Sequence, residues 1–314
     1  MWAGSGDTRP ATRVETAQWR NAGSPTKSVV ISPQRSYLVC ATQRSGSTLL
    51  CELLKDTGVA GRPEEYFEAT RETGLPPHPG QYLEGLPRTG AGIRDDPSPP
   101  AAPPHSSLQG LASYRDHLER TFNLGTTKNG VFGSKLMWSQ LSELHALAGD
   151  LPQYEGLGRF ELLQKLLNCP RYIRVTRREK VRQAVSLWRA LQTRSWRAEH
   201  GGADGGPAPL QYRFEGIDHL VRALYEEDRA WCEFFSAHGV SPFSIVYEDQ
   251  LDGDRDGTVR RALAHIGVGA PPGWQAVEPI KRQADAMSEE WVAAYHRDAA
   301  RHGGNRSAAD VAAI

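Results

Sequence analysis

The sequence lacks the features of membrane-spanning, exported and nucleic-acid-binding proteins. No apolar run approaches the ~18 residues that cross a bilayer, and residues 1–26 lack the apolar middle of a signal peptide. Lysine plus arginine equals aspartate plus glutamate at 37 each. The chain therefore has no basic excess of the kind that non-specific nucleic-acid binding requires. We expect neither a nucleic-acid partner nor a membrane span.

Patterns for metal binding and for disulfides are missing as well. The four cysteines lie far apart without a C-x-x-C pair, and the ten histidines form no H-E-x-x-H motif. Cys40 and Cys51 have apolar neighbours and are expected to be buried thiols. These observations predict no bound metal and favour a reducing, cytoplasmic location.

A loop that can bind an anion is the most informative feature present. Residues 37–40 form an apolar run typical of a buried strand, and leucines between 49 and 54 recur at helical spacing. Small hydroxylated residues, one glycine and one cation lie between them: Gln43-Arg44-Ser45-Gly46-Ser47-Thr48. Backbone N–H groups of such a loop and of the following helix form a cradle for phosphate.

This loop departs at two positions from the P-loop of nucleoside-triphosphate enzymes, G-x-x-x-x-G-K-[ST]. Ala41 replaces the first glycine, and Ser47 stands in place of the lysine. That lysine serves the β- and γ-phosphates, so its loss argues against a triphosphate donor. The one cationic residue of the loop is instead Arg44. The loop therefore predicts an anion site that does not serve ATP.

Strands and helices alternate along most of the chain. We expect strands at 37–40, 130–138, 172–176 and 243–247, and helices at 108–122, 139–147, 158–167, 179–192 and 217–238, with two more at the end. This order predicts an α/β, P-loop-like fold with a central parallel sheet flanked by helices. Residues 1–27 are expected to form a disordered tail before a single domain, 28–314, with a Pro/Gly-rich excursion at about 74–107.

A second anion site is suggested where the third strand ends. Arg177 would point into the same crevice as Arg44, because ligands of such sheets bind beyond the carboxyl ends of the strands. Ser186 follows about two helical turns later, at ~1.5 Å rise per residue, and could bind the same phosphate. Alone, these residues would more often be a solvated helix start. With the first loop, they suit a donor that carries phosphate at both ends of a nucleoside.

These motifs resemble those of sulfotransferases that use 3′-phosphoadenosine-5′-phosphosulfate (PAPS). Residues 43–48 are similar to the P-K-S-G-T-T loop of these enzymes, and Arg177 and Ser186 match their 3′-phosphate motif. The chain is most similar to the trehalose 2-sulfotransferase family, in order over residues 36–300. The segments that carry this similarity are 43–50, 56–61, 135–138, 183–190, 192–194 and 282–285.

The resemblance implies PAPS as donor, 3′-phosphoadenosine 5′-phosphate (PAP) as product, and no metal. It implies that the donor is bound by Arg44, Ser45, Gly46, Ser47, Thr48, Arg177, Ser186 and Arg282. Arg44 would also act in catalysis, by neutralising charge on the leaving phosphate. The general base of the family lies in a G-x-P-x-E-[FY]-F segment, where this chain has Glu65. Glu64 is expected to point elsewhere.

The implied acceptor is a hydroxyl of a carbohydrate, trehalose or a related glycoside, or of a similar small alcohol. The positions that match the family's acceptor site are Gln43, Arg62, Glu65, Pro77 and Tyr82, with Tyr82 in place of a tryptophan. Arg62 stands where the trehalose enzymes carry an acid. A guanidinium only donates hydrogen bonds, so an anionic or glycosylated acceptor would suit it. The resemblance also implies a homodimer.

Two other functions stay open at this point. A small-molecule kinase would need lysine at position 47 and a metal-holding acid. Glu248 and Asp249 follow the fourth strand, but capping and structural pairing suit them better. A nucleotide-binding regulatory module would keep both anion sites without a working base. Lys135 ends the second strand on the ligand side and is a further candidate, although a lysine there is usually exposed.

Overall fold

A four-stranded parallel sheet forms the centre of the computed structural model, which describes residues 33–68, 82–83, 113–193, 210–277 and 286–303. The strand order is β2-β1-β3-β4. The strands are β1 (Arg35–Ala41), β2 (Val131–Met137), β3 (Arg171–Thr176) and β4 (Phe243–Val246). The predicted α/β architecture with a parallel sheet is confirmed. The expected tail at 1–27 and nearly all of the 74–107 excursion lie outside the described residues.

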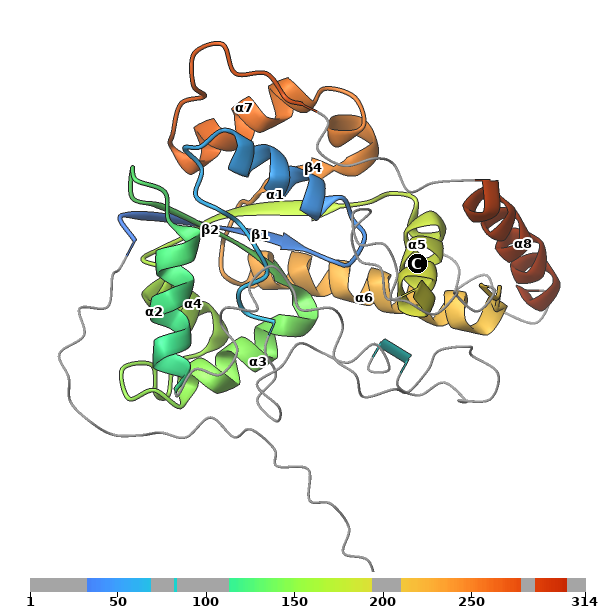
Figure 1. Cartoon of the computed structure of the whole chain (residues 1–314). Helices are drawn as coiled ribbons and strands as arrows, with labels where there is room; N and C mark the ends of the chain where they lie inside the picture. Colours follow the sequence, from blue (N-terminus) through green and yellow to red (C-terminus); the bar gives the residue numbers. More distant parts are fainter. Residues whose placement is uncertain (1–32, 69–81, 84–112, 194–209, 278–285, 304–314) are drawn as a thin grey trace, which may run out of the picture.

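Helices connect the strands and cover both faces of the sheet (Figure 1). They are α1 (Ser47–Asp56), α2 (Tyr114–Gly125), α3 (Trp138–Gly149), α4 (Arg159–Leu166), α5 (Lys180–Thr193), α6 (Phe214–Ala237), α7 (Arg255–Ile266) and α8 (Ala286–Gly303), with a π-helical turn at Tyr247–Leu251. The helix expected at 108–122 is observed at Tyr114–Gly125, and residues 108–112 are not described. Across the described ranges, no helix is long and apolar enough to cross a membrane.

The alternation of side chains along β1 divides the core into two layers. Tyr37 and Val39 are buried against α1 and α7, on the upper face in Figure 1. Leu38 and Cys40 are buried on the opposite face with residues of α2, α3, α4 and α6. Successive residues of a strand point to opposite faces, so a strand covered on both sides must be apolar throughout. The sequence of β1 meets this requirement, and Cys40 is a buried thiol as expected.

The carboxyl ends of the three adjoining strands lie level with one another. Ala41, the last residue of β1, pairs with Met137 at the end of β2 and with Val175 near the end of β3. The loop after β1 therefore emerges between the ends of its two neighbours. Beyond this edge, α5 packs against α6 and α8 around a third apolar cluster. This arrangement places the loops after β1, β2 and β3 together.

Candidate active site

The loop after β1 has the backbone of an anion cradle. Gly46, at the N-terminal cap of α1, has φ +93°, and a Cβ built there would lie 2.3 Å from the ring of Tyr247. Only glycine fits this position without strain and collision. No side chain caps the first turn of α1, and the buried Ser45 hydroxyl has no hydrogen-bond partner in the described structure. Free helix N–H groups beside an unpaired hydroxyl suit a bound phosphate or sulfate.

Arg44 connects this loop to α5. Its Nε donates a hydrogen bond to the Ser186 hydroxyl at 3.0 Å. Burial lowers the pKa of Arg44 to about 10, with further contributions from the positive charges of Arg177 and Arg189. The guanidinium therefore stays charged at neutral pH. Cations from the loop, from the end of β3 and from α5 converge here, and an anion with several negative charges would relieve their mutual repulsion.

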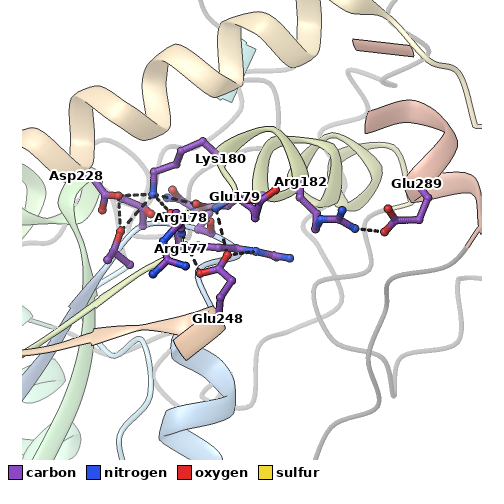
Figure 2. Close-up of polar contacts among 12 residues, drawn as sticks. Arg177, Arg178, Glu179, Lys180, Arg182, Asp228, Glu248 and Glu289 are labelled. Carbon is purple, nitrogen blue, oxygen red and sulfur yellow. Dashed lines mark hydrogen bonds and ion pairs between the residues drawn. The ribbon is translucent and has the colours of Figure 1, made fainter. Parts of the chain in front are cut away.

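Arg177 is held at the end of β3 by an aromatic ring and a carboxylate. Its guanidinium lies over the Tyr247 ring, 5.0 Å from the centroid, and its Nε is 3.5 Å from Glu248 Oε1. Glu248 also accepts hydrogen bonds from the backbone N–H groups of Arg178 and Glu179, at 3.0 and 3.1 Å (Figure 2). The capping role expected of Glu248 is thus observed. It fixes the turn between β3 and α5 that presents Arg177.

Lys180, the first residue of α5, stabilises the connection between β3 and α5 through its contacts with α6. Its ammonium pairs with Asp228 of α6 and donates to the Arg177 carbonyl at 2.6 Å (Figure 2). Asp228 also accepts a hydrogen bond from the Thr176 hydroxyl at 2.6 Å. Arg178, in contrast, is exposed and pairs with Asp249. Of the two adjacent arginines, Arg177 is therefore the one whose charge reaches Arg44.

Glu65 lies next to the loop through a buried lysine. Lys135 Nζ is 2.7 Å from Glu65 Oε1 and donates to the Thr48 hydroxyl at 2.9 Å. Gln140 Nε2 donates to the other carboxylate oxygen at 2.9 Å. A lysine at a strand end is usually exposed, but Lys135 is only 3% exposed, because its side chain points from β2 toward α1. Burial lowers the pKa of Lys135, but the charge of Glu65 outweighs this and raises it overall, so the ammonium persists.

Glu64 is turned away from this group. Its carboxylate pairs with Lys55 of α1, while its backbone carbonyl accepts a hydrogen bond from Lys135 N–H at 2.9 Å and its backbone forms a bridge with Ser134. Adjacent residues of an extended segment point in opposite directions. The predicted difference between Glu64 and Glu65 is therefore observed.

The residues expected to contact the acceptor are gathered only in part. The Gln43 side chain donates to the Ser139 hydroxyl at 3.2 Å and is hydrogen-bonded to the hydroxyl of Tyr82. Burial raises the pKa of Tyr82, and the negative charges of Glu65 and Glu227 raise it further. The charges of both glutamates therefore act on Tyr82. The Arg62 side chain is exposed. Pro77 and Arg282 lie outside the described residues.

Two glutamines of the site had no role assigned from the sequence. Gln140 orients Glu65, as described above. Gln183, fully buried on α5, donates to the Thr42 hydroxyl at 2.9 Å and to the Gln43 carbonyl at 2.6 Å. It thereby holds the start of the loop against α5. Both contacts join residues far apart in sequence, so no local pattern could have indicated them. In the described part of the chain, no cluster of three or more histidine, cysteine or acidic residues is arranged to hold a metal.

Comparison with known proteins identifies relatives of this site. The family model described as Stf0 sulphotransferase matches residues 36–298. A trehalose 2-sulfotransferase of Mycobacterium tuberculosis is 35% identical over 291 residues, which cover 86% of this chain and 97% of that protein. A trehalose 2-sulfotransferase of Mycolicibacterium smegmatis is 36% identical over 281 residues, which cover 85% and 97%. The matched region contains every described residue of the site.

Proposed function

Since the chain belongs to the Stf0 sulphotransferase family, we propose that it transfers the sulfuryl group of PAPS to a hydroxyl of a carbohydrate, with trehalose or a related glycoside as the first candidate. The names of the two relatives support the choice of acceptor. The observation that carries the choice of donor is the hydrogen bond from Arg44 to Ser186. It brings the loop for one phosphate and the motif for a second into one charged cluster.

The described residues fit both ends of such a donor. The N–H groups of the loop and the hydroxyls of Ser45, Ser47 and Thr48 would bind the 5′-phosphosulfate. Arg177 and Ser186 would bind the 3′-phosphate, with Arg282 added by family resemblance. When bound, PAPS supplies an activated sulfuryl group on its 5′-phosphate. Arg44 would then neutralise the charge left on that phosphate, in a site where burial strengthens electrostatic attraction.

Glu65 is the general base of this proposal. It would accept the proton of the acceptor hydroxyl while that oxygen bonds to sulfur. Lys135 and Gln140 hold one carboxylate oxygen each, which fixes the direction of the carboxylate. Lys135 also touches Thr48 of the loop. Lys135 therefore connects the base directly to the proposed donor loop. Transfer between two substrates depends on this kind of alignment.

The acceptor specificity is proposed to depend on Gln43, Arg62, Tyr82 and Pro77. The contact between Gln43 and Tyr82 supports this proposal, as does the effect of the Glu65 charge on Tyr82. The Arg62 side chain is exposed, and in this proposal it would favour acceptors with an anionic or glycosyl substituent. Arg62→Glu should shift the preference among trehalose, glucose and anionic sugars. An unchanged order of acceptors would contradict a role for Arg62.

We also propose, from the family resemblance, that the protein forms a homodimer. The described cysteines are all free thiols, which supports a cytoplasmic location. Light scattering over a range of protein concentrations would test the first proposal, and cell fractionation the second.

Calorimetry with PAP and with Mg–ATP tests the donor, and transfer of labelled sulfuryl groups from PAPS to a panel of sugars tests the acceptor. We expect PAP to bind tightly, Mg–ATP to bind weakly, and trehalose or a related glycoside to become labelled. Tight binding of Mg–ATP with no PAP binding would overturn the donor. A panel without any labelled sugar would overturn the acceptor class.

A further inference from the structure

A second partly buried glutamate, Glu227 of α6, lies near the proposed acceptor site. Trp231, one turn further along α6, donates its indole N–H to the Ala41 carbonyl at the end of β1, at 3.1 Å. Phe235, one more turn along, packs against Tyr172 near the start of β3, with 5.6 Å between ring centroids. The helix therefore runs antiparallel to the strands. Glu227 consequently lies past the carboxyl edge of the sheet, on the side of the loop after β1.

The surroundings of Glu227 link it to residues already placed in the site. The negative charges of Glu65 and Glu227 both raise the pKa of Tyr82, and the Tyr82 hydroxyl is hydrogen-bonded to Gln43. The helix, the loop after β1 and the segment around Tyr82 thus contribute neighbouring polar groups. The adjacent Asp228 has a different task, because it pairs with Lys180 and Thr176 at the end of β3.

The carboxyl group of Glu227 is not satisfied by the protein. Its Oε2 is buried and has no hydrogen-bond partner in the described structure. Burial, and to a lesser extent the charge of Asp228, raises the pKa of Glu227 to about 8. At neutral pH the group is therefore largely a neutral carboxyl, which can both donate and accept a hydrogen bond. Buried polar groups in native proteins are nearly always bonded, so an unbonded one beside a proposed binding site points to a ligand.

We infer that Glu227 is an acceptor-binding residue. It forms a hydrogen bond with a second hydroxyl of the sugar, distinct from the hydroxyl that is sulfated. This inference rests on the proposed function. Glu65 and Glu227 then act on the same sugar in different ways. Glu65 removes the proton of the reacting hydroxyl, and Glu227 fixes the orientation of the ring. Because a sugar carries several hydroxyls, a neutral carboxyl that donates and accepts is well matched to it. A simple monohydric alcohol would leave Glu227 unbonded.

The test compares Glu227→Leu and Glu227→Gln with Glu226→Gln, a matched control on the same helix whose side chain is exposed. Sulfuryl transfer from labelled PAPS is measured with the best sugar of the panel and with a monohydric alcohol, and PAP affinity is measured by calorimetry. Glu227→Leu should raise KM for the sugar by about tenfold or more, as expected when a buried hydrogen bond to substrate is lost. Glu227→Gln, which keeps a donor and an acceptor, should have a smaller effect.

PAP affinity and the transfer to a monohydric alcohol should stay as in the wild type for both variants, and Glu226→Gln should change nothing. Equal KM values for the sugar in wild type and Glu227→Leu would overturn the inference while leaving the proposed function intact. Loss of PAP binding in Glu227→Gln, a change too small to prevent folding, would also overturn it and assign Glu227 to structural support of the donor site. If the wild type sulfates no sugar, the proposed function fails first and the inference falls with it.

Discussion

Replacing Gly46 with alanine tests how the loop after β1, the proposed donor loop, is built. The glycine has φ +93°, and a Cβ at this position would lie 2.3 Å from Cδ2 of Tyr247. The Tyr247 ring also lies beneath Arg177. An added methyl group must therefore either twist the loop or displace the ring that supports Arg177 of the proposed donor site.

The cost has two parts that can be separated. The left-handed backbone costs an L-residue about 1–2 kcal/mol, and forcing a methyl group into a packed contact costs about 1–3 kcal/mol. Gly58 provides the matched control, because its φ is +69° and nothing lies within 4 Å of its added Cβ. Gly58→Ala should therefore show the backbone part alone. Gly46→Ala should show both parts, so its total cost is about 2–5 kcal/mol.

Chemical unfolding and PAP calorimetry, with and without Tyr247→Ala, give the assay. Removing the ring removes the collision, so Gly46→Ala should cost about 1–3 kcal/mol less in the Tyr247→Ala background. It should also weaken PAP binding, whereas Gly58→Ala should not. An equal cost of Gly46→Ala in both backgrounds would refute the role assigned to Tyr247.

Two further predictions concern single side chains. Arg177→Met should weaken PAP binding by about 10- to 100-fold, the usual effect of losing hydrogen bonds to a charged group. Arg178→Met removes only an exposed ion pair and should leave PAP affinity nearly unchanged. Similar losses of affinity in both variants would contradict the placement of Arg177. Because the pKa of Glu227 is raised to about 8, the folded protein holds that proton to a higher pH than the unfolded chain, so the free energy of unfolding should decline as pH rises from about 5 to 8. Glu227→Gln should remove that part of the decline in chemical unfolding, and an unaltered pH profile would contradict the raised pKa.

The strands and the anion cradle after β1 were predictable because their signals are local. An apolar run of the length of β1 can only be buried, and a glycine among small hydroxylated residues between a strand and a helix indicates an anion cradle. Parallel pairing then places the ends of β1 and β3 side by side, which brings Arg44 and Arg177 together. The pairing of Glu64 with Lys55, away from the site, also follows from the alternation of an extended segment.

The supports of Glu65 were not predictable in the same way. Lys135 looks like an exposed lysine at a strand end, and only the packing of β2 beside α1 shows that it is buried between Thr48 and Glu65. Gln140, Gln183 and Glu227 lie in ordinary amphipathic helices, where a polar residue is usually solvated. Their contacts depend on how α3, α5 and α6 pack against the sheet. Such long-range geometry leaves no periodic signal in the sequence.

The most direct test of the account is the turnover of Glu65→Gln with labelled PAPS and trehalose, measured beside PAP binding, with Glu64→Gln as the control. We predict that both variants bind PAP as the wild type does, that Glu64→Gln keeps its turnover, and that Glu65→Gln loses about 10²- to 10⁴-fold in kcat, the usual contribution of a general base. Glu65→Gln with nearly wild-type kcat would contradict the assignment of the base. So would equal losses in the two variants.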